Sequence, residues 1–469
     1  MRYDRSVSGY YIENFGCRAT QADGAALERQ FENRGMARAL SAAEASVVVL
    51  NTCTVTAAAD QDARAAIRRV QRRNPEASIV VTGCYAQRAP EEIAKIPGVS
   101  LVVGNSHKIQ LAELALGNQP TRPTSSSFIP VTALSDSTFK ERPIFVSDIF
   151  AHTELLAAPV FDAANERTRP NLKIQDGCNN RCSFCVIPFV RGQSRSMGTE
   201  RIIVEVNTLV AAGYREVVIS GINLGRWGRD LEDDRKTQVG SRKPTLERLI
   251  RTILAETSLE KIRISSVEPM DWTDELIDLV ASSRRIAKHA HVPMQSGSDA
   301  VLRRMHRKYR PWHYRQKIEK IRAAMRDAAI GADVMVGFPG ETDMEFESTR
   351  RMIEDLPFTY LHVFTYSARP GTPAAGMRDQ VPVHVARERN RVLRELASAK
   401  KLAFMRSFVG RSVEGITLNV VGTDTQGEYT EALTDNYLKL RLRGRHAPNH
   451  WKTFTVDEVV DGVLVGRAA

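Results

Sequence analysis

Short apolar runs alternate with helical patterns through the first third of the chain. Three of these runs are rich in β-branched residues and end in cysteine: SGYYIENFGC, ASVVVLNTC and ASIVVTGC, at residues 8–17, 45–53 and 77–84. Helical patterns at 22–35 and 58–75 lie between them. This alternation predicts a parallel α/β sheet over residues 1–117. Because ligands bind at the carboxyl ends of such strands, the cysteines are expected to converge; three separately buried core cysteines are the alternative.

The middle of the chain repeats the alternation after an interruption. The segment GNQPTRPTSSSFIP, at residues 117–130, opens the stretch 118–170, and its richness in Pro, Ser and Thr predicts a linker. From residue 171 to 405, the runs expected to be strands are NLKIQD, EVVIS, KIRISSVEP, KHAHVPMQ, GADVMVGFP and YLHVFTYS. Six parallel strands with helices between most of them predict a partial (βα)6 barrel, whose catalytic face lies at the strand ends.

The last segment, residues 408–469, shows short strands, glycine-containing turns and no long helical pattern, which predicts a small β-barrel. In YLKLRLR, the leucines alternate with Lys439, Arg441 and Arg443, so the three cations share one face of a strand. With Tyr437 and His446 nearby, this row is interpreted as an RNA-binding face, and a solvated outer face is the alternative.

Charge and composition narrow the class of protein. The 469 residues carry 66 Lys and Arg against 55 Asp and Glu, a formal net charge of +11. The run Val301–Arg326 contains a single acid, Glu319; it is either a solvated helix face or a track for phosphates. No apolar run is long enough to span a membrane, and the first residues lack the apolar region of a signal peptide. A cytoplasmic protein is expected.

Three of the six cysteines, Cys178, Cys182 and Cys185, lie in DGCNNRCSFCVIPFVRGQSRS. Three thiolates do not complete a structural zinc site, which needs four ligands, and no histidine lies between His152 and His289. Iron–sulfur clusters are also held by thiolates, normally four per cubane, so three leave one iron open. The spacing resembles the signature of the radical S-adenosylmethionine superfamily, and the aromatic Phe184 before the last cysteine agrees with it.

The resemblance implies a 4Fe–4S cluster at these cysteines, whose open iron chelates S-adenosylmethionine. Three later segments resemble the cofactor-binding elements of the superfamily, in the same order: GINLG, SSVEP and VGFPGE. The residues that the resemblance assigns to cofactor binding are Phe184, Gly221, Asn223, Ser265, Glu268 and Gly337. Each of these segments is also an ordinary strand-to-helix turn in many proteins.

Cys17, Cys53 and Cys84 again supply three ligands, which would leave one iron of a cubane without a protein ligand. The segments NFGC, NTCTVTAAA, GCYAQR, HVPMQSGSDAVLRRM and FTYSARPGTPAA, taken with the cysteine triplet, resemble the methylthiotransferases in order and over nearly the whole chain. That family has an N-terminal α/β domain, a radical barrel and a C-terminal RNA-binding TRAM barrel. The resemblance implies a second 4Fe–4S cluster at Cys17, Cys53 and Cys84, which carries the sulfur and faces the first across a shared chamber.

The branch of the family is indicated by the residues after two of these cysteines. Thr54-Val55-Thr56 and Tyr85-Ala86-Gln87 resemble the branch that acts on N6-threonylcarbamoyladenosine of transfer RNA, beside the anticodon. The isopentenyladenosine branch and the ribosomal-protein branch are the alternatives. The first motif departs from the family pattern, because Thr20 stands where an Asn is common, and no role is carried over to that position.

The resemblance implies a transfer-RNA anticodon loop as substrate and an electron-donor protein as partner. An aromatic C–H at C2 of adenine is not acidic, so the radical cofactor supplies the chemistry and no acid or base residue is assigned. A nucleic-acid-binding protein with structural or redox-sensing clusters is a further interpretation. Oligomeric state, sulfur source and the particular transfer RNAs are not indicated, although a monomer is consistent with the sequence.

Overall fold

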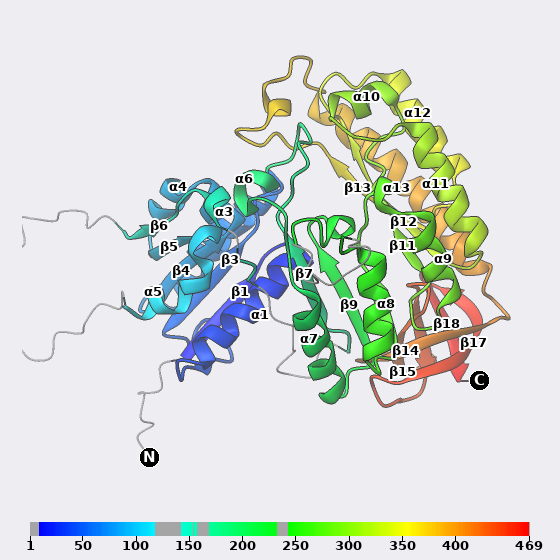
Figure 1. The fold of residues 1–469 in the computed structure, drawn as a ribbon, viewed down its shortest axis with the longest axis horizontal. Helices are drawn as coiled ribbons and strands as arrows, with labels where there is room; N and C mark the ends of the chain where they lie inside the picture. The colour runs from blue at the N-terminus through cyan, green and yellow to red at the C-terminus, as the bar shows by residue number, and fades with distance from the viewer. Residues whose placement is uncertain (1–8, 118–141, 153, 157–167, 232–242, 469) are drawn as a thin grey trace, which may run out of the picture. The chain divides into compact units, whose positions relative to one another are not determined.

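The computed structural model describes residues 9–117, 142–152, 154–156, 168–231 and 243–468 (Figure 1). Two compact units account for the chain. The first comprises Met1–Ala158 with Phe189–Gly192, and the second comprises Pro159–Pro188 with Gln193–Ala469. No helix among the described residues has the length and apolar character needed to cross a membrane.

The first unit is a parallel sheet covered by helices. Its strands pair in the order β2-β1-β3-β4-β5-β6, every pairing being parallel. The elements run β1 Gly9–Asn14, α1 Arg18–Glu32, β2 Ala37–Arg38, β3 Val47–Thr52, α2 Ala57–Arg73, β4 Ser78–Gly83, α3 Cys84–Arg88, α4 Pro90–Ala94, β5 Val99–Gly104, α5 Leu111–Gly117 and β6 Ile144–Phe145. The predicted parallel α/β sheet is confirmed.

Strand β3 shows why the sheet takes two helical layers. Val47 and Val49 pack in the hydrophobic cluster that holds Leu27 of α1, whereas Val48 packs in the cluster that holds Ile67 of α2. Successive side chains of a strand point to opposite faces, so an uninterrupted apolar run is buried on both. Helix α2 is amphipathic and is capped by Thr56, whose side chain accepts from the Ala59 N–H at 3.2 Å.

The described part of the expected linker contributes to this unit. Ile144 and Phe145 form β6, which pairs with Val102 and Val103 at the edge of the sheet. Residues 118–141, 153 and 157–167 of that segment lie outside the described residues. The Pro- and Ser-rich composition therefore did not reveal that the chain returns to the first sheet before the next unit begins.

The second unit begins with a barrel of parallel strands. Its elements are β7 Asn171–Asp176, α6 Ile187–Arg191 (which ends in the first unit), β8 Arg195–Ser196, α7 Thr199–Ala211, β9 Glu216–Gly221, α8 Leu246–Glu256, β10 Lys261–Ile264, α9 Asp274–Ser282, β11 His289–His291, α10 Asp299–Arg304, α11 Pro311–Ala324, β12 Ala329–Val336, α12 Asp343–Asp355, β13 Tyr360–Thr365 and α13 Val383–Arg406.

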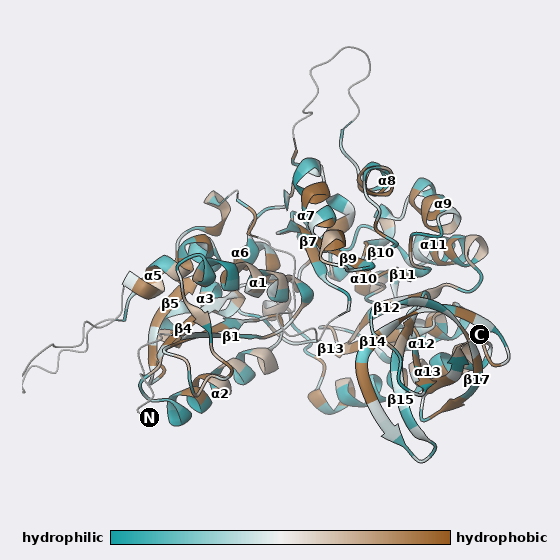
Figure 2. Ribbon diagram, turned by 90° about the horizontal axis from the view of Figure 1, so that it is seen from below, coloured by the Kyte–Doolittle hydropathy of each residue, from teal (hydrophilic) through white to brown (hydrophobic). Residues whose placement is uncertain are grey.

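These strands form the predicted partial barrel. The sheets β10-β9-β7-β8 and β11-β12-β13 are joined by parallel bridges between Ile262 and Ile286 and between Ser266 and His291. The long strands occur where the sequence predicts them, and β8 is a short antiparallel addition beside β7. In Figure 2 several helices carry one hydrophilic and one hydrophobic side, as expected of helices that cover a sheet.

The C-terminal strands close into a small barrel, as the sequence predicts. They are β14 Ser412–Asp424, β15 Gly427–Thr434, β16 Lys439–Arg443, β17 Trp451–Val460 and β18 Val463–Ala468, in the order β14-β15-β16-β18-β17. Leu438, Leu440 and Leu442 lie in its core with Phe454. The alternation in YLKLRLR is therefore confirmed.

The turn before β16 packs into the parallel barrel of the same unit. The guanidinium of Arg263, on β10, donates to the carbonyl oxygens of Thr434 and Asp435. The ring of Tyr437 lies 4.7 Å from that of His289 on β11. Tyr437 thus packs at the end of the parallel barrel where β11 begins. It does not lie beside the cationic row, as its position in the sequence suggests.

Candidate active site

The loop after β7 carries Cys178, Cys182 and Cys185. It leaves the strand through Gly177, which has φ +71°, and the Gly177 N–H donates to Asp176 Oδ1 at 2.8 Å. The Cys185 N–H donates to the Cys182 carbonyl at 3.1 Å, so the loop turns back on itself. A left-handed residue and a tight turn bring three thiols of one short segment to the end of one strand.

Burial affects the protonation of two of these thiols in the absence of metal. It raises the pKa of Cys185 to about 12, and the nearby Cys182 and Cys178 raise it further. The pKa of Cys178 is also raised, chiefly by burial, although the Asn180 N–H opposes this by donating to its sulfur at 3.4 Å. Cys178 and Cys185 are therefore protonated at neutral pH, and they become anionic when iron binds.

Each cysteine triplet brings three thiol ligands to one place in the fold. A structural zinc ion takes four protein ligands, whereas a cubane held by three thiolates keeps one iron open for another ligand. The donor sets therefore fit a cubane. Among the described residues, a different set of possible ligands, His291, Asp333 and His362, brings three ligand atoms within 4.8 Å of one another.

Gln175, at the end of β7, joins the cysteine loop to the glycine-containing turn after β9. Its amide nitrogen donates to the Gly177 carbonyl at 2.8 Å, and its amide oxygen accepts from the Asn223 N–H at 2.7 Å. A Cβ on Gly221 would lie 2.8 Å from the same oxygen, so this position needs glycine for close packing. The amide of Asn223 donates to Cys178 Sγ at 3.5 Å.

Asn223 also offers an unused acceptor. Its Oδ1 is buried and has no hydrogen-bond partner among the described residues. A buried carbonyl oxygen without a donor is costly, and an ammonium group would satisfy it. This agrees with the expected role of the GINLG turn, which places an acceptor beside the cysteine loop where the amino group of S-adenosylmethionine is expected.

A small pocket opens beside Cys182. Arg307 lies at its wall, donating to Cys182 Sγ at 3.3 Å and pairing with the carboxylate of Glu268. The pKa of the Arg307 guanidinium is well above its ordinary value; burial opposes this shift, and the nearby Tyr309, Glu268 and Cys182 outweigh burial. A permanent cation thus faces the cysteine loop and suits an anionic cluster or a cofactor carboxylate.

The remaining predicted cofactor residues lie around the same strand ends. Phe184 packs edge-on against Phe338, with 6.3 Å between ring centroids. Ser265 follows β10 and donates its N–H to the Ile219 carbonyl at 3.0 Å. Gly337 has φ +73°, and a Cβ there would lie 2.6 Å from the Cβ of Ala386. Packing on α13 is therefore sufficient reason for glycine at 337, whether or not it contacts a cofactor.

The other three cysteines follow strand ends of the first unit, as predicted. Cys17 occupies the N-cap of α1, Cys53 follows β3 directly, and Cys84 begins α3 after β4. A Cβ on Gly16, which has φ +105°, would lie 2.7 Å from the Cβ of Cys53. Burial raises the pKa of Cys53 to about 11, with Cys84 and Cys17 adding to the rise. Residues far apart in sequence thus meet at one edge of the sheet.

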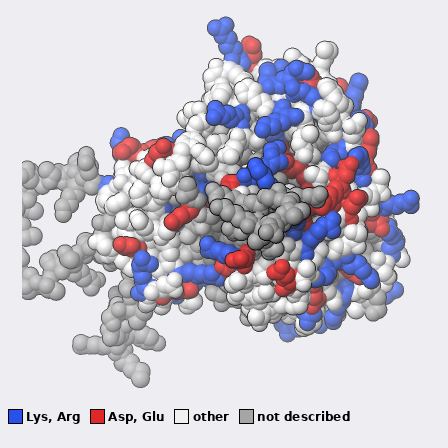
Figure 3. Space-filling view, viewed as in Figure 1, with Lys and Arg blue, Asp and Glu red and all other residues white. Residues whose placement is uncertain are grey.

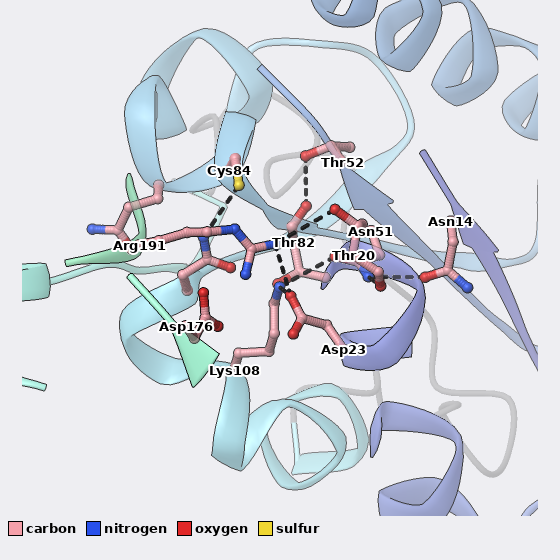
Figure 4. Close-up of polar contacts among 12 residues, drawn as sticks. Asn14, Thr20, Asp23, Asn51, Thr52, Thr82, Cys84, Lys108, Asp176 and Arg191 are labelled. Atoms are coloured by element: carbon pink, nitrogen blue, oxygen red, sulfur yellow. Dashed lines mark hydrogen bonds and ion pairs between the residues drawn. The ribbon is translucent and has the colours of Figure 1, made fainter. Parts of the chain in front are cut away.

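A buried polar network lies behind this triplet (Figure 4). Lys108 Nζ lies 3.1 Å from Asp23 Oδ2 and 3.2 Å from Asn51 Oδ1, and the guanidinium of Arg191 lies 3.1 Å from the same Asp23 oxygen. Burial lowers the pKa of Lys108, while Asp23 opposes that shift. Two cations against one carboxylate near the thiols suit a site that binds an anionic cluster.

The residues that suggested the branch of the family support the structure around Cys53 and Cys84. Thr54 Oγ1 donates to Asp60 Oδ1 at 2.6 Å, and Arg88 donates to both, at 2.8 Å to Thr54 and 2.9 Å to Asp60. The loop after Cys53 is thus tied to the helix that begins at Cys84. Packing and hydrogen bonding therefore explain the presence of threonine at 54 and, as the cap of α2, at 56, without any contact with a substrate.

The cationic row of the small barrel is partly neutralised. Lys439 is exposed and lies 3.7 Å from Glu431, while Arg441 lies over the ring of Tyr429. Arg443 donates with one nitrogen to both Asp424 oxygens, at 2.8 and 3.0 Å. Lys439 and Arg441 are consequently better placed than Arg443 to meet a phosphate.

The basic run Val301–Arg326 is largely ion-paired. Its pairs are Arg303–Asp299, Arg304–Glu345, Arg307–Glu268, Arg310–Asp299, Arg315–Asp355, Lys317–Asp274 and Lys320–Asp274. On the face shown in Figure 3, Lys and Arg side chains are interspersed with Asp and Glu. The pairing favours a solvated helix face over a phosphate track for this run.

Sequence reasoning missed several residues that hold these sites. Gln175 and Arg307 contact the cysteine loop, and Lys108, Asp23 and Arg191 form the network behind the other triplet. Gln175 carried a usable signal, because it stands at the end of a predicted strand just before the first cysteine. The others come from distant segments, and no local pattern marked them.

Two segments of the chain match protein families. Residues 9–104 match the family described as "Uncharacterized protein family UPF0004", and residues 172–353 match the radical SAM superfamily. A threonylcarbamoyladenosine tRNA methylthiotransferase MtaB from Bacillus subtilis is 37% identical over 92% of this chain and 90% of its own. The protein of the same name from Aquifex aeolicus is 34% identical over 92% and 96%.

Another relative bears the name of the alternative activity. A tRNA-2-methylthio-N(6)-dimethylallyladenosine synthase from Novosphingobium aromaticivorans is 34% identical over 87% of this chain and 86% of its own. Among solved structures, the radical S-adenosylmethionine methyltransferase TsrM from Kitasatospora setae superposes with a TM-score of 0.51, at 16% identity, over 78% of this chain and 77% of its own. At that identity the similarity concerns the fold.

Proposed function

Since the chain belongs to the methylthiotransferase family of radical S-adenosylmethionine enzymes, we propose that it inserts a methylthio group at C2 of N6-threonylcarbamoyladenosine, beside the anticodon of transfer RNA. The observation that carries this proposal is the 37% identity to the MtaB protein of Bacillus subtilis over 92% of the chain. The enzyme uses S-adenosylmethionine and two 4Fe–4S clusters.

The two cysteine sites divide the work. Cys178, Cys182 and Cys185 would hold the cluster that binds S-adenosylmethionine, and Cys17, Cys53 and Cys84 the cluster that carries sulfur. The cofactor and its cluster supply the carbon radical that an unactivated C–H requires. Asn223 would accept from the amino group of the cofactor through its buried Oδ1, and Arg307 and Glu268 line the pocket beside Cys182. These residues bind and orient; none moves a proton.

The second site would hold its cluster in front of a charged, buried network. Lys108 and Arg191 place positive charge behind the thiols, and Asp23 holds the two cations in position. Positive charge favours the thiolate over the thiol and stabilises the negative charge that three thiolates bring to a cubane. The chain's role at this site is therefore to stabilise an anionic sulfur donor.

The RNA partner is proposed to meet the small barrel through Lys439 and Arg441. Alanine at Lys439, Arg441 and Arg443 together should weaken binding of an anticodon stem-loop and flatten its salt dependence, by about 0.7–0.9 in logarithmic slope for each phosphate that is no longer neutralised. Arg391→Ala on α13, where the arginine is paired with Glu388 and Glu395, serves as the control. An unchanged slope in the triple variant would return the row to a solvated face.

The substrate is tested by mass spectrometry of transfer-RNA nucleosides from cells with and without this protein. The proposal expects 2-methylthio-N6-threonylcarbamoyladenosine to disappear without the protein and its precursor to accumulate. Loss of the methylthio derivative of isopentenyladenosine instead would assign the alternative activity named for the Novosphingobium relative. We further propose a cytoplasmic enzyme that receives electrons from a separate donor protein.

A further inference from the structure

One face of the sheet β11-β12-β13 is lined by polar and aromatic side chains. In β12 the alternate residues Ile330, Ala332 and Val334 are buried, and Ala386 of α13 packs on Gly337 at the end of the strand. Asp333 lies on the other face of β12 and is in register with His362 on β13; His291 on β11 is in register with Gly331. The concave side of the barrel therefore carries the polar residues.

Three side chains on this face converge, and they form a group called here the His–Asp–His triad: His291, Asp333 and His362. His291 Nε2 lies 3.4 Å from Asp333 Oδ1, and His362 Nδ1 lies 3.2 Å from the same oxygen. Side-chain exposure rises across the group, from 9% for His291 to 26% for Asp333 and 55% for His362. The triad is thus anchored at one end and accessible at the other.

The protonation of the triad follows from the carboxylate. Burial would raise the pKa of Asp333, but its interactions with the nearby imidazoles of His291 and His362 outweigh burial and hold the pKa well below its ordinary value. An ionised carboxylate can accept and cannot donate, so His362 Nδ1 carries a proton. The other nitrogen of that ring, Nε2, is consequently available to a ligand on the exposed side.

His291 is fixed from behind. Its Nδ1 lies 3.0 Å from Ser266 Oγ, on the segment that follows β10. Its Nε2 is buried and makes no hydrogen bond of normal length among the described residues. His291 Nε2 lies 3.4 Å from Asp333 Oδ1, which is too long for a strong hydrogen bond. The triad is therefore arranged to accept a ligand and is not a completed hydrogen-bond network.

The triad lies between the cofactor end and the floor of the barrel. Met335, two residues beyond Asp333 and about 7 Å further along the strand, packs on the same hydrophobic cluster as Phe184, which precedes the last cysteine of the loop. On the other side, Tyr360 and His289 are stacked with 5.9 Å between centroids, and Tyr437 closes this end. A nucleobase reacting at the cofactor end would direct a long substituent toward the triad.

We propose that the His–Asp–His triad recognises the N6 substituent of the substrate adenosine by hydrogen bonds to its N–H and O–H groups. This inference rests on the proposed function and deepens it. A threonylcarbamoyl substituent has ureido N–H and hydroxyl donors, which match the Asp333 carboxylate and His362 Nε2. Its own carboxylate would be repelled by Asp333 and must therefore face away from it. An isopentenyl group has none, and it would leave these polar groups without partners once water is excluded.

The test measures binding of three anticodon stem-loops of one sequence, which carry adenosine, isopentenyladenosine or threonylcarbamoyladenosine at the target position. Wild-type protein with both clusters should prefer the threonylcarbamoyl loop to the unmodified loop. His362→Phe and Asp333→Asn should each reduce that preference about tenfold while leaving affinity for the unmodified loop unchanged. His384→Phe, at an exposed position at the start of α13, is the matched control and should leave the preference intact.

Outcomes separate this inference from the proposed function. A wild-type preference that survives in both triad variants would overturn the inference and leave the proposed function standing. A wild-type enzyme that binds and modifies only the isopentenyl loop would overturn the proposed function itself. Loss of the preference on treatment with a chelator that leaves both clusters intact would show that a divalent ion bridges triad and substrate, and would overturn direct hydrogen bonding.

Discussion

The two three-cysteine sites have the same ligands and are built in opposite ways. Cys178, Cys182 and Cys185 belong to one loop, whose shape depends on Gly177 and on local hydrogen bonds. Cys17, Cys53 and Cys84 follow three different strands and meet because those strands are parallel neighbours. A site within one loop depends on a few turns, whereas a site spread over a sheet depends on the register of the whole first unit.

Their surroundings differ as well. The loop site has a small pocket beside Cys182, and its cation Arg307 is paired with Glu268 at the wall of that pocket. At the sheet site, the cations Lys108 and Arg191 are buried and share one carboxylate, Asp23. The first arrangement presents a cation and a carboxylate to a pocket, which suits a cofactor with charged groups. The second is closed behind the thiols and suits a cluster that must retain an anionic ligand.

The largest expected effect comes from the loop site. Cys182→Ala should abolish cleavage of S-adenosylmethionine, because the cubane would lose one of its protein ligands and the cofactor its attachment. The measurement is 5′-deoxyadenosine released by reduced, reconstituted protein, with iron content falling by half. Cleavage that persists at the wild-type rate would remove these cysteines from the cofactor site.

Cys53→Ala at the sheet site should separate the two activities. Methylthio insertion should stop, while some 5′-deoxyadenosine is still released, because the loop site does not use this ligand. Iron content should again fall by half. If insertion and cleavage both continue in protein that lacks the second cluster, the division of labour between the sites is wrong.

The same contrast explains how far the sequence could predict the molecule. Periodic apolar runs predict both parallel sheets and the C-terminal barrel, because strand burial imposes a pattern on neighbouring residues. The loop triplet is readable from its spacing alone. The convergence of Cys17, Cys53 and Cys84 needed the added rule that parallel strands end at one edge.

Long-range side-chain partners were beyond that reasoning. Lys108 reaches Asp23 across 85 positions, and nothing near either residue marks the pair. His291, Asp333 and His362 lie in three predicted strands, but which residues share the concave face and stand in register depends on strand pairing. The strand β6 was missed because two residues at a sheet edge give too short a pattern.

A smaller effect tests the sheet site without touching a thiol. Gly16→Ala places a methyl 2.7 Å from the Cβ of Cys53, at a backbone φ of +105°. The strain should cost about 1–3 kcal/mol and loosen the second cluster, lowering methylthio insertion severalfold with cleavage of S-adenosylmethionine intact. Gly198→Ala is the control, since nothing lies within 4 Å of its added Cβ. Equal iron content and insertion in both variants would show that the sheet site tolerates this displacement.

The smallest effect concerns the cluster-free protein and the order in which its thiols react. Cys17 is exposed and should be alkylated first by iodoacetamide. Burial raises the pKa of Cys53 to about 11 and that of Cys185 to about 12, so at pH 8 about one in a thousand and one in ten thousand of these thiols are ionised. Because the thiolate is the nucleophile, labelling of both should rise about tenfold per pH unit up to those values.

Mass spectrometry of peptides after timed labelling at pH 8 and pH 9 gives the six rates, and protein in guanidinium chloride, where all six thiols are exposed, is the control. Labelling of Cys185 as fast as that of Cys17 would mean that the loop site opens when its cluster is absent. The expected slow rate would instead mean that both sites are formed before iron arrives. Each cluster must then displace protons from buried thiols, so reconstitution of both should be favoured as the pH rises.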